Sequence, residues 1–137
     1  YLVAPGAFAA SLRRRGPAQV RMLYQHFAHS PIGVWEEIAE DSRGLYVRGR
    51  LVSDVERARD VRALLAEGAL NGLSIGFRTV RAKRGATGRT LLEVELWEIS
   101  VVTFPLLAGS QVTAIGTKSA GFVRRLRQAS AALRRLA

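Results

Sequence analysis

Ser74 lies between two glycines in the segment NGLSIGF, and its hydroxyl is a candidate nucleophile. A serine hydroxyl is a weak nucleophile until a neighbouring base removes its proton. The chain has two histidines, His26 and His29, and both stand in one earlier segment, QHFAH. These residue types allow acyl transfer, in which Ser74 attacks a carbonyl carbon and one of the histidines is the general base.

A catalytic histidine also needs a third group that holds its ring in the correct tautomer and orientation. The acidic run LEVELWEIS follows the serine and offers three carboxylates, Glu93, Glu95 and Glu98. The chain order is then base, nucleophile, carboxylate, which is compatible with a serine hydrolase. The spacing alone leaves open which of the three carboxylates would take this role.

Ser74 also fits the pattern G-x-S-x-G, but this match does not place the chain among the α/β-hydrolases. In that family the serine sits on a turn from a strand into a helix, and the histidine comes last in the chain. Here the run Ile75–Val80 alternates and favours a strand, and both histidines come first. The structural alternative for Ser74 is a small buried strand residue beside a glycine turn.

The elements before the serine follow from turn residues and hydrophobic periodicity. A short helix is expected over Ala7–Arg15, because three arginines end it and a Gly-Pro pair closes it. The break at Ser30-Pro31 makes His29 a loop residue in this interpretation, while His26 ends a strand. Three strands are expected in this part of the chain, over Gln19–Gln25, Ile32–Ala39 and Leu45–Val52.

A second helix is expected to begin at a capping box formed by Ser53 and Glu56 and to stop at Gly68. The basic segment Arg81–Arg89 is expected to be a long exposed loop that joins the Ser74 strand to the next one. The later strands are expected over Thr90–Trp97, Ile99–Phe104 and Gln111–Ile115. About seven short strands with two or three helices predict an α+β, mainly β fold, a closed or nearly closed antiparallel barrel surrounded by a few helices.

The size and composition fit one globular domain with a charged tail. The chain has 137 residues, 48% of them apolar, and no cysteine, which excludes disulfide frameworks and thiolate metal sites. No apolar run reaches the roughly 20 residues that span a bilayer, so no membrane segment is expected. The first residue, Tyr1, falls in the middle of a sequence pattern and not at its start, so we expect the native N-terminus to lie before it.

The net charge of +10 is concentrated near the end of the chain. The segment Lys118–Ala137 holds six basic residues and no acidic one, which leaves +10 − 6 = +4 for residues 1–117. We therefore divide the chain into a catalytic domain over residues 1–117 and a basic C-terminal amphipathic helix within residues 118–137. The helix is predicted over Gly121–Leu136, since its apolar residues are three and four apart. It would pack on the domain, or serve docking, targeting or nucleic-acid contact outside the catalytic machinery.

Five short segments, in this order, resemble the prohead (capsid maturation) serine proteases of tailed bacteriophages, which are similar in fold to the herpesvirus assemblins. The segments are APGAF at residues 4–8, MLYQH and PIG within residues 22–33, EDSRGL at 40–45, GALNGLSIGF at 68–77 and EISVVTFP at 98–105. The resemblance covers roughly residues 3–112. It implies an assemblin-like β-barrel.

By this resemblance His26 is the general base, Ser74 the nucleophile and Glu98 the third catalytic residue. Assemblins have a second histidine in the third role, but no histidine follows Ser74 here, so a carboxylate would orient the imidazole. Assemblins also use a pair of arginines for the oxyanion hole, whereas this chain has none between Arg89 and Arg124. A backbone donor near the glycines would replace them.

The resemblance implies a serine endopeptidase, without cofactor or metal, that cleaves the scaffold segment of the capsid precursor and also itself. Its partners would be the major capsid protein precursor and the scaffold, with self-association and nucleic-acid contact through the basic tail as further candidates. It would act inside the immature capsid, in the cytoplasm of the bacterial host. Two other functions stay open, a non-catalytic scaffold- or nucleic-acid-binding module and a protease fold kept for shell assembly.

Overall fold

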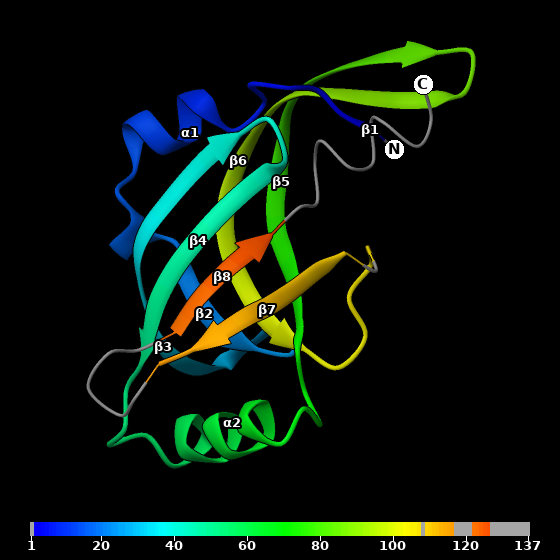
Figure 1. The fold of residues 1–137 in the computed structure, drawn as a ribbon. Helices are drawn as coiled ribbons and strands as arrows, with labels where there is room; N and C mark the ends of the chain where they lie inside the picture. Colours follow the sequence, from blue (N-terminus) through cyan, green and yellow to red (C-terminus); the bar gives the residue numbers. More distant parts are fainter. Residues whose placement is uncertain (1, 108, 117–121, 127–137) are drawn as a thin grey trace.

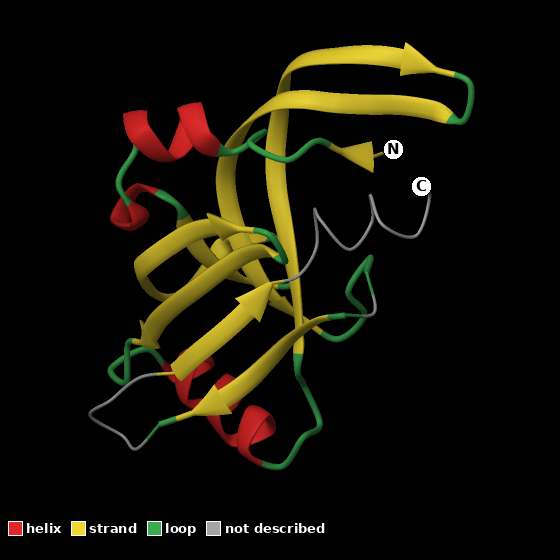
Figure 2. Cartoon of the chain, turned by 45° about the horizontal axis from the view of Figure 1, so that its top comes forward, coloured by secondary structure: helices red, strands yellow, loops and turns green. Residues whose placement is uncertain are grey.

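The computed structural model describes residues 2–107, 109–116 and 122–126. Over these residues the protein is mainly β, with two α-helices outside a strongly curled sheet (Figures 1 and 2). The helices are α1 (Ala9–Arg14) and α2 (Glu56–Ala66), and the short 3-10 helix η1 covers Pro17–Gln19. The strands are β1 (Leu2–Val3), β2 (Arg21–Tyr24), β3 (Phe27–Asp41), β4 (Gly44–Leu51), β5 (Gly72–Gly85), β6 (Gly88–Val102), β7 (Ser110–Ile115) and β8 (Phe122–Leu126).

Hydrogen bonding joins the strands in the order β1-β6-β2-β3-β4-β8-β7-β5, and β5 also pairs with β6. The sheet therefore curls back toward its own beginning through the β5–β6 hairpin. On the other side of β5, β7 is joined by a single residue pair, Gly72 with Gln111. The prediction of a mainly β, barrel-like sheet with a few helices is confirmed at this level.

The prediction of a purely antiparallel sheet is wrong, because β6 pairs in parallel with both β1 and β2. Parallel neighbours need a long connection between them, and β3, β4, α2 and β5 lie between β2 and β6. The parallel ladder runs from Arg21 opposite Glu98 to Tyr24 opposite Val101. As a result, the residues that follow β2, including His26, lie beside the end of β6.

The hydrophobic core fills the inside of the curl. Strand alternation sends Leu73 and Ile75 of β5 and Ile99 and Val101 of β6 into this core. The buried face of α2 adds Ala58, Val61 and Leu65. Each fully buried aliphatic side chain stabilises the fold by about 1.5–3 kcal/mol, so the β5–β6 hairpin is anchored on its inner face and can present polar residues on the other.

The helix α2 is confirmed, but its predicted cap is not. The N-cap position belongs to Val55 and has no side-chain hydrogen bond, so the capping box of Ser53 and Glu56 is wrong. The chain turns at this point through a backbone bond from the Val55 N–H to the Val52 carbonyl. At the other end Gly68 has a φ of +74°, the left-handed conformation that glycine adopts without strain, which confirms the predicted stop.

Two exposed segments differ from the predictions. The long loop expected over Arg81–Arg89 is wrong, since β5 and β6 stay paired out to Gly85 opposite Gly88. The helix expected over Gly121–Leu136 is wrong for Phe122–Leu126, which forms β8 between β4 and β7. Two open strand edges offer rows of backbone hydrogen bonds that a short isolated helix, marginal in water, does not satisfy. The rest of the predicted helix lies outside the described residues.

Candidate active site

Ser74 and Glu98 lie on the outer face of the β5–β6 hairpin. The two neighbours of Ser74 along β5 belong to the hydrophobic core, and successive residues of a strand point to opposite faces. The register opposes Ser74 to Ser100 and Gly76 to Glu98. Side chains directly opposite each other in an antiparallel pair share a face. The serine and the carboxylate that were predicted to act together are therefore next-nearest neighbours on one surface of the hairpin.

His26 lies in a tight turn between β2 and β3 whose backbone conformation is unusual. Tyr24 pairs with Phe27, so Gln25 and His26 form a two-residue hairpin loop. Their φ angles are +53° and +63°, the pattern of a type I′ turn, in which glycine and asparagine are preferred. Holding other residues there costs roughly 1–3 kcal/mol each and persists only where the surroundings enforce it. Such strain is concentrated at functional sites.

Four hydrogen bonds fix this turn against the end of β6. The Gln25 N–H donates to the Val101 carbonyl over 2.9 Å. The Gln25 side chain donates to Thr103 Oγ1 over 2.6 Å and accepts from the Thr103 N–H over 3.2 Å. The His26 N–H donates to Ser100 Oγ over 3.0 Å. The backbone beside the imidazole is thereby held to the strand that carries Glu98.

The imidazole of His26 contacts the carboxylate of Glu98, with Nδ1 bonded to Oε1. The other carboxylate oxygen, Oε2, accepts a hydrogen bond from Ser100 Oγ over 2.6 Å. Ser100 is fully buried, so its hydroxyl joins the backbone of His26 to the side chain of Glu98 inside the protein. Because an ionised carboxylate only accepts hydrogen bonds, this contact favours the tautomer with the proton on Nδ1, which leaves Nε2 as the proton acceptor.

The two other candidate carboxylates have different partners. Glu93 lies 3.7 Å from Arg14 Nη1. Glu95 accepts hydrogen bonds from Arg78 Nε and Nη2 over 3.1 and 2.8 Å. The Arg78 side-chain hydrogen bond, more than any other contact, lowers the pKa of Glu95. Among the three glutamates, Glu98 is the one in contact with His26.

Gly76 provides the space that the Glu98 carboxylate occupies. A Cβ atom at this position would lie 2.8 Å from Glu98 Cδ and 2.9 Å from Cγ, and closer still to Oε1. Gly76, the second glycine of the G-x-S-x-G pattern, is therefore explained by packing, because a side chain there would collide with the Glu98 carboxylate of the neighbouring strand. It does not mark the turn of an α/β-hydrolase.

The hydroxyl of Ser74 has no hydrogen-bond partner among the described residues, although the residue is only 2% exposed. A buried hydroxyl without a partner costs about 1–3 kcal/mol, and such a group calls for an explanation. Ser110 shares this property, but no described contact links it to a histidine or carboxylate. The structure brings Ser74 to the face of the His26–Glu98 pair, without a hydrogen bond between Ser74 and the imidazole.

Sequence reasoning missed Ser100 and gave His29 the wrong setting. The spacing Glu-x-Ser already places Glu98 and Ser100 on one face of a strand, but the partner of that face was not predictable locally. His29 lies within β3, is exposed, and makes no described contact with the cluster.

Within residues 2–107, 109–116 and 122–126, no group of three or more His, Cys, Asp or Glu side chains could hold a metal ion. In the same part of the chain no helix is long and apolar enough to cross a bilayer.

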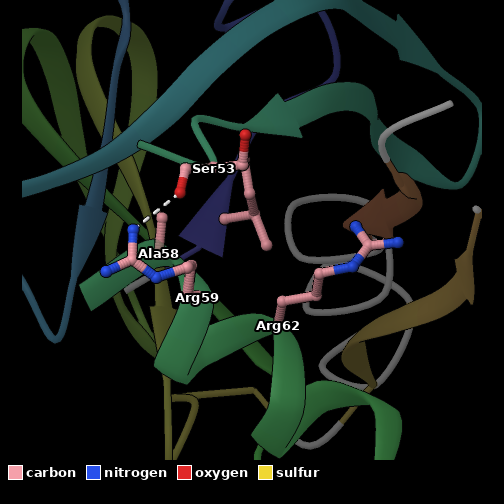
Figure 3. A pocket seen from close by; sticks show the side chains of 5 residues that line it. Ser53, Ala58, Arg59 and Arg62 are labelled. Atoms are coloured by element: carbon pink, nitrogen blue, oxygen red, sulfur yellow. Dashed lines mark hydrogen bonds between the residues drawn. The ribbon is translucent and has the colours of Figure 1, made fainter. Parts of the chain in front are cut away.

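A cavity of about 440 Å³ lies beside α2, and none of its described lining residues belongs to the His26 cluster. Leu51, Ser53, Ala58, Arg59 and Arg62 line it (Figure 3). Both arginines bond to backbone carbonyls, with Arg59 Nη1 2.9 Å from the Ser53 oxygen and Arg62 Nη2 2.9 Å from the Gly116 oxygen. Among the described residues that line it there is neither a histidine nor a carboxylate, so these residues offer no acid–base pair for catalysis.

Comparison with known proteins gives two matches. The model of the caudovirus prohead serine protease family matches residues 2–123. The prohead protease of Enterobacteria phage HK97 is 35% identical over 130 residues, which are 92% of this chain and 56% of that protein. The chain thus spans about half the length of this curated relative. No solved structure matches the chain, so the expected likeness to the herpesvirus assemblins stays a prediction.

Proposed function

Because the chain belongs to the family of caudovirus prohead serine proteases, we propose that it is a serine endopeptidase of capsid maturation. Ser74 is the nucleophile in this proposal, His26 the general base and Glu98 the residue that orients the imidazole. The observation that carries it is the contact of Glu98 with the His26 ring, on the hairpin face of Ser74, whose hydroxyl has no partner in the described part of the chain. A carboxylate, an imidazole and a serine hydroxyl together are the groups that acyl transfer needs.

The reaction follows from the roles of these groups. His26 Nε2 takes the proton of Ser74 as Oγ attacks the peptide carbonyl carbon, and the negative charge passes to the carbonyl oxygen. Glu98 on Nδ1 stabilises the imidazolium. His26 then protonates the leaving amine, the C–N bond breaks, and an acyl-enzyme remains. The same imidazole deprotonates a water molecule, which attacks the ester and restores the Ser74 hydroxyl.

Ser100 is a positioning residue in this mechanism. Its hydroxyl accepts from the His26 N–H and donates to Glu98 Oε2, so the turn and the carboxylate share one buried anchor. A misplacement of about 1 Å can reduce a rate by 100-fold. Because one hydroxyl bonds to both groups, it holds the imidazole and the carboxylate at a constant position relative to each other.

The substrate in this proposal is the precursor of the major capsid protein, from which the enzyme removes the scaffold segment, and the enzyme also cleaves itself. Cleavage takes place inside the immature capsid in the bacterial host. The family description and the name of the HK97 relative support a role in the prohead.

A fluorophosphonate probe tests the proposal, because it labels serines that a neighbouring base activates. The expected adduct, mapped by mass spectrometry, is on Ser74. Labelling should disappear in Ser74→Ala and fall by several orders of magnitude in His26→Ala, since residues of a triad act as one unit. His29→Ala is the matched control and should label at close to the wild-type rate. An adduct on another serine, or labelling that depends on His29, would refute these roles.

A further inference from the structure

The far end of the β5–β6 hairpin forms an arm that extends beyond the curled sheet (Figures 1 and 2). Register shifts between Thr79 and Arg81, and between Arg81 and Ala82, interrupt the ladder where the arm begins. Irregularities of this kind bend and twist a strand pair. Pairing then resumes and continues to Gly85 opposite Gly88. The arm is therefore a hydrogen-bonded ribbon that leaves the sheet in its own direction.

Three cations near the end of the arm have no partner in the described part of the chain. Lys83, Arg84 and Arg89 are exposed and take part in no hydrogen bond, ion pair or ring contact there. Arg84 lies directly opposite Arg89 in the ladder. Like charges in this arrangement destabilise a strand pair. An anion between the two guanidinium groups would turn this repulsion into attraction.

The same three cations border a hollow of about 410 Å³ on the arm, which we call the arm groove. Its other lining residues are Thr79, Val80 and Ala82. Val80 is 45% exposed, so the groove presents apolar surface beside its positive charge. No acidic residue is among the lining residues described, and a ligand that fits must therefore combine negative charge with small apolar groups.

We propose that the arm groove binds an acidic segment of polypeptide, and, resting on the function proposed above, that this segment belongs to the protease substrate. Carboxylates of such a segment pair with Lys83, Arg84 and Arg89, and its aliphatic side chains contact Val80 and Ala82. A nucleic-acid duplex presents a convex row of phosphates, and its sugar–phosphate backbone carries no aliphatic side chain to place beside Val80 and Ala82. The mixed lining therefore favours a polypeptide.

The position of the groove sets where the acidic segment lies relative to the cleaved bond. Ser74 and Lys83 stand on one strand, 83 − 74 = 9 residues apart, which is at most roughly 30 Å at about 3.3 Å per residue, because the strand bends where the arm begins. An extended substrate covers that distance with about nine residues or fewer. Binding at the arm raises the local concentration of the substrate at the serine, since the second contact becomes intramolecular.

The test is the binding of a fluorescein-labelled peptide of alternating glutamate and valine to the full chain, followed by fluorescence anisotropy. Ser74→Ala serves as the background, so that no peptide is cleaved. The triple variant Lys83→Glu/Arg84→Glu/Arg89→Glu should weaken binding by about tenfold or more, because three exposed charge pairs are lost. Neutral replacements of the same three residues by glutamine should weaken it less. Binding should also weaken with added salt, which screens exposed charges.

The matched control is Arg13→Glu/Arg43→Glu/Arg50→Glu, which makes the same change in net charge at exposed positions outside the β5–β6 hairpin, in α1, the β3–β4 turn and β4. It should bind the peptide within about twofold of the parent protein. The proposal is overturned if the control loses as much affinity as the arm variant, if the peptide does not bind, or if a DNA duplex of equal charge binds more tightly. Circular dichroism establishes that each variant is folded. Since this binding involves no chemistry, its outcome is independent of the serine labelling that tests the proposed function.

Discussion

Replacing Gly76 by alanine is the most direct test of how the candidate site is built. The added Cβ would lie 2.8 Å from Glu98 Cδ, whereas ordinary contacts are 3.4–4 Å, so this atom must move by at least 3.4 − 2.8 = 0.6 Å. Oε1, which is closer to the new atom, must move by on the order of 1 Å. The φ of Gly76 is not in the left-handed region, so alanine is compatible with the backbone.

A displacement of this size at the carboxylate should be visible in the rate of the reaction. A misplacement of about 1 Å can cost about 100-fold, equivalent to about 2.7 kcal/mol of transition-state stabilisation. The melting temperature should change little, because the atoms in the way belong to the end of a flexible side chain that can move aside. We expect Gly76→Ala to be a folded protein with a rate of fluorophosphonate labelling at Ser74 reduced by about two orders of magnitude.

The matched control is Gly16→Ala, where a Cβ would meet no atom within 4 Å. This variant should label at the wild-type rate. A folded Gly76→Ala that labels as fast as the wild type would show that the position of the Glu98 carboxylate is irrelevant to the serine. In that case the role assigned to Glu98 would be wrong, whatever the identity of the nucleophile.

Four other outcomes follow from the structure. Ser100→Ala should reduce kcat by about 10–100-fold and shift the pH profile of the reaction. Ser100→Thr, which keeps the hydroxyl, should restore much of the rate. An unchanged pH profile in Ser100→Ala would make the role of Ser100 purely structural. Glu98→Gln should lower the rate of labelling but leave the fold intact, and an unchanged rate would contradict its orienting role. Deletion of residues 118–137 removes β8 and should lower the free energy of unfolding by on the order of 5 kcal/mol, measured by thermal melting. Deletion of residues 127–137 alone leaves β8 in place and is the control. Because Arg78 lowers the pKa of Glu95, that carboxylate stabilises the protein fully above its unfolded pKa and loses this contribution as the pH falls through its folded pKa. The difference in melting temperature between wild type and Glu95→Gln should therefore begin to shrink below pH 4.5 and vanish once the pH is below the folded pKa. A difference that is constant with pH would contradict the assignment.

The sequence by itself determined the features that depend on neighbouring residues. Alternation placed Ser74 on a strand and not on a strand-to-helix turn, which excluded the α/β-hydrolases. The stop of α2 at Gly68 was readable because a left-handed residue after a helix is a local requirement. Alternation also predicted strands on both sides of Glu98, over Thr90–Trp97 and Ile99–Phe104, but the prediction of a break between them is wrong, since the single strand β6 runs through Glu98.

Only the tertiary structure decided which segments meet. The contact of His26 with Glu98 joins residues 72 positions apart, and its hydrogen bond to Ser100 joins residues 74 positions apart. Both depend on the parallel pairing of β2 with β6, for which no local pattern exists, since period-two alternation is the same in parallel and antiparallel strands. The sequence shows that residue 76 is a glycine but not why it is one, because the Glu98 carboxylate that occupies the space beside it comes from another strand. The basic tail shows the same limit: its spacing favoured a helix, while the open edges of β4 and β7 stabilise residues 122–126 as a strand.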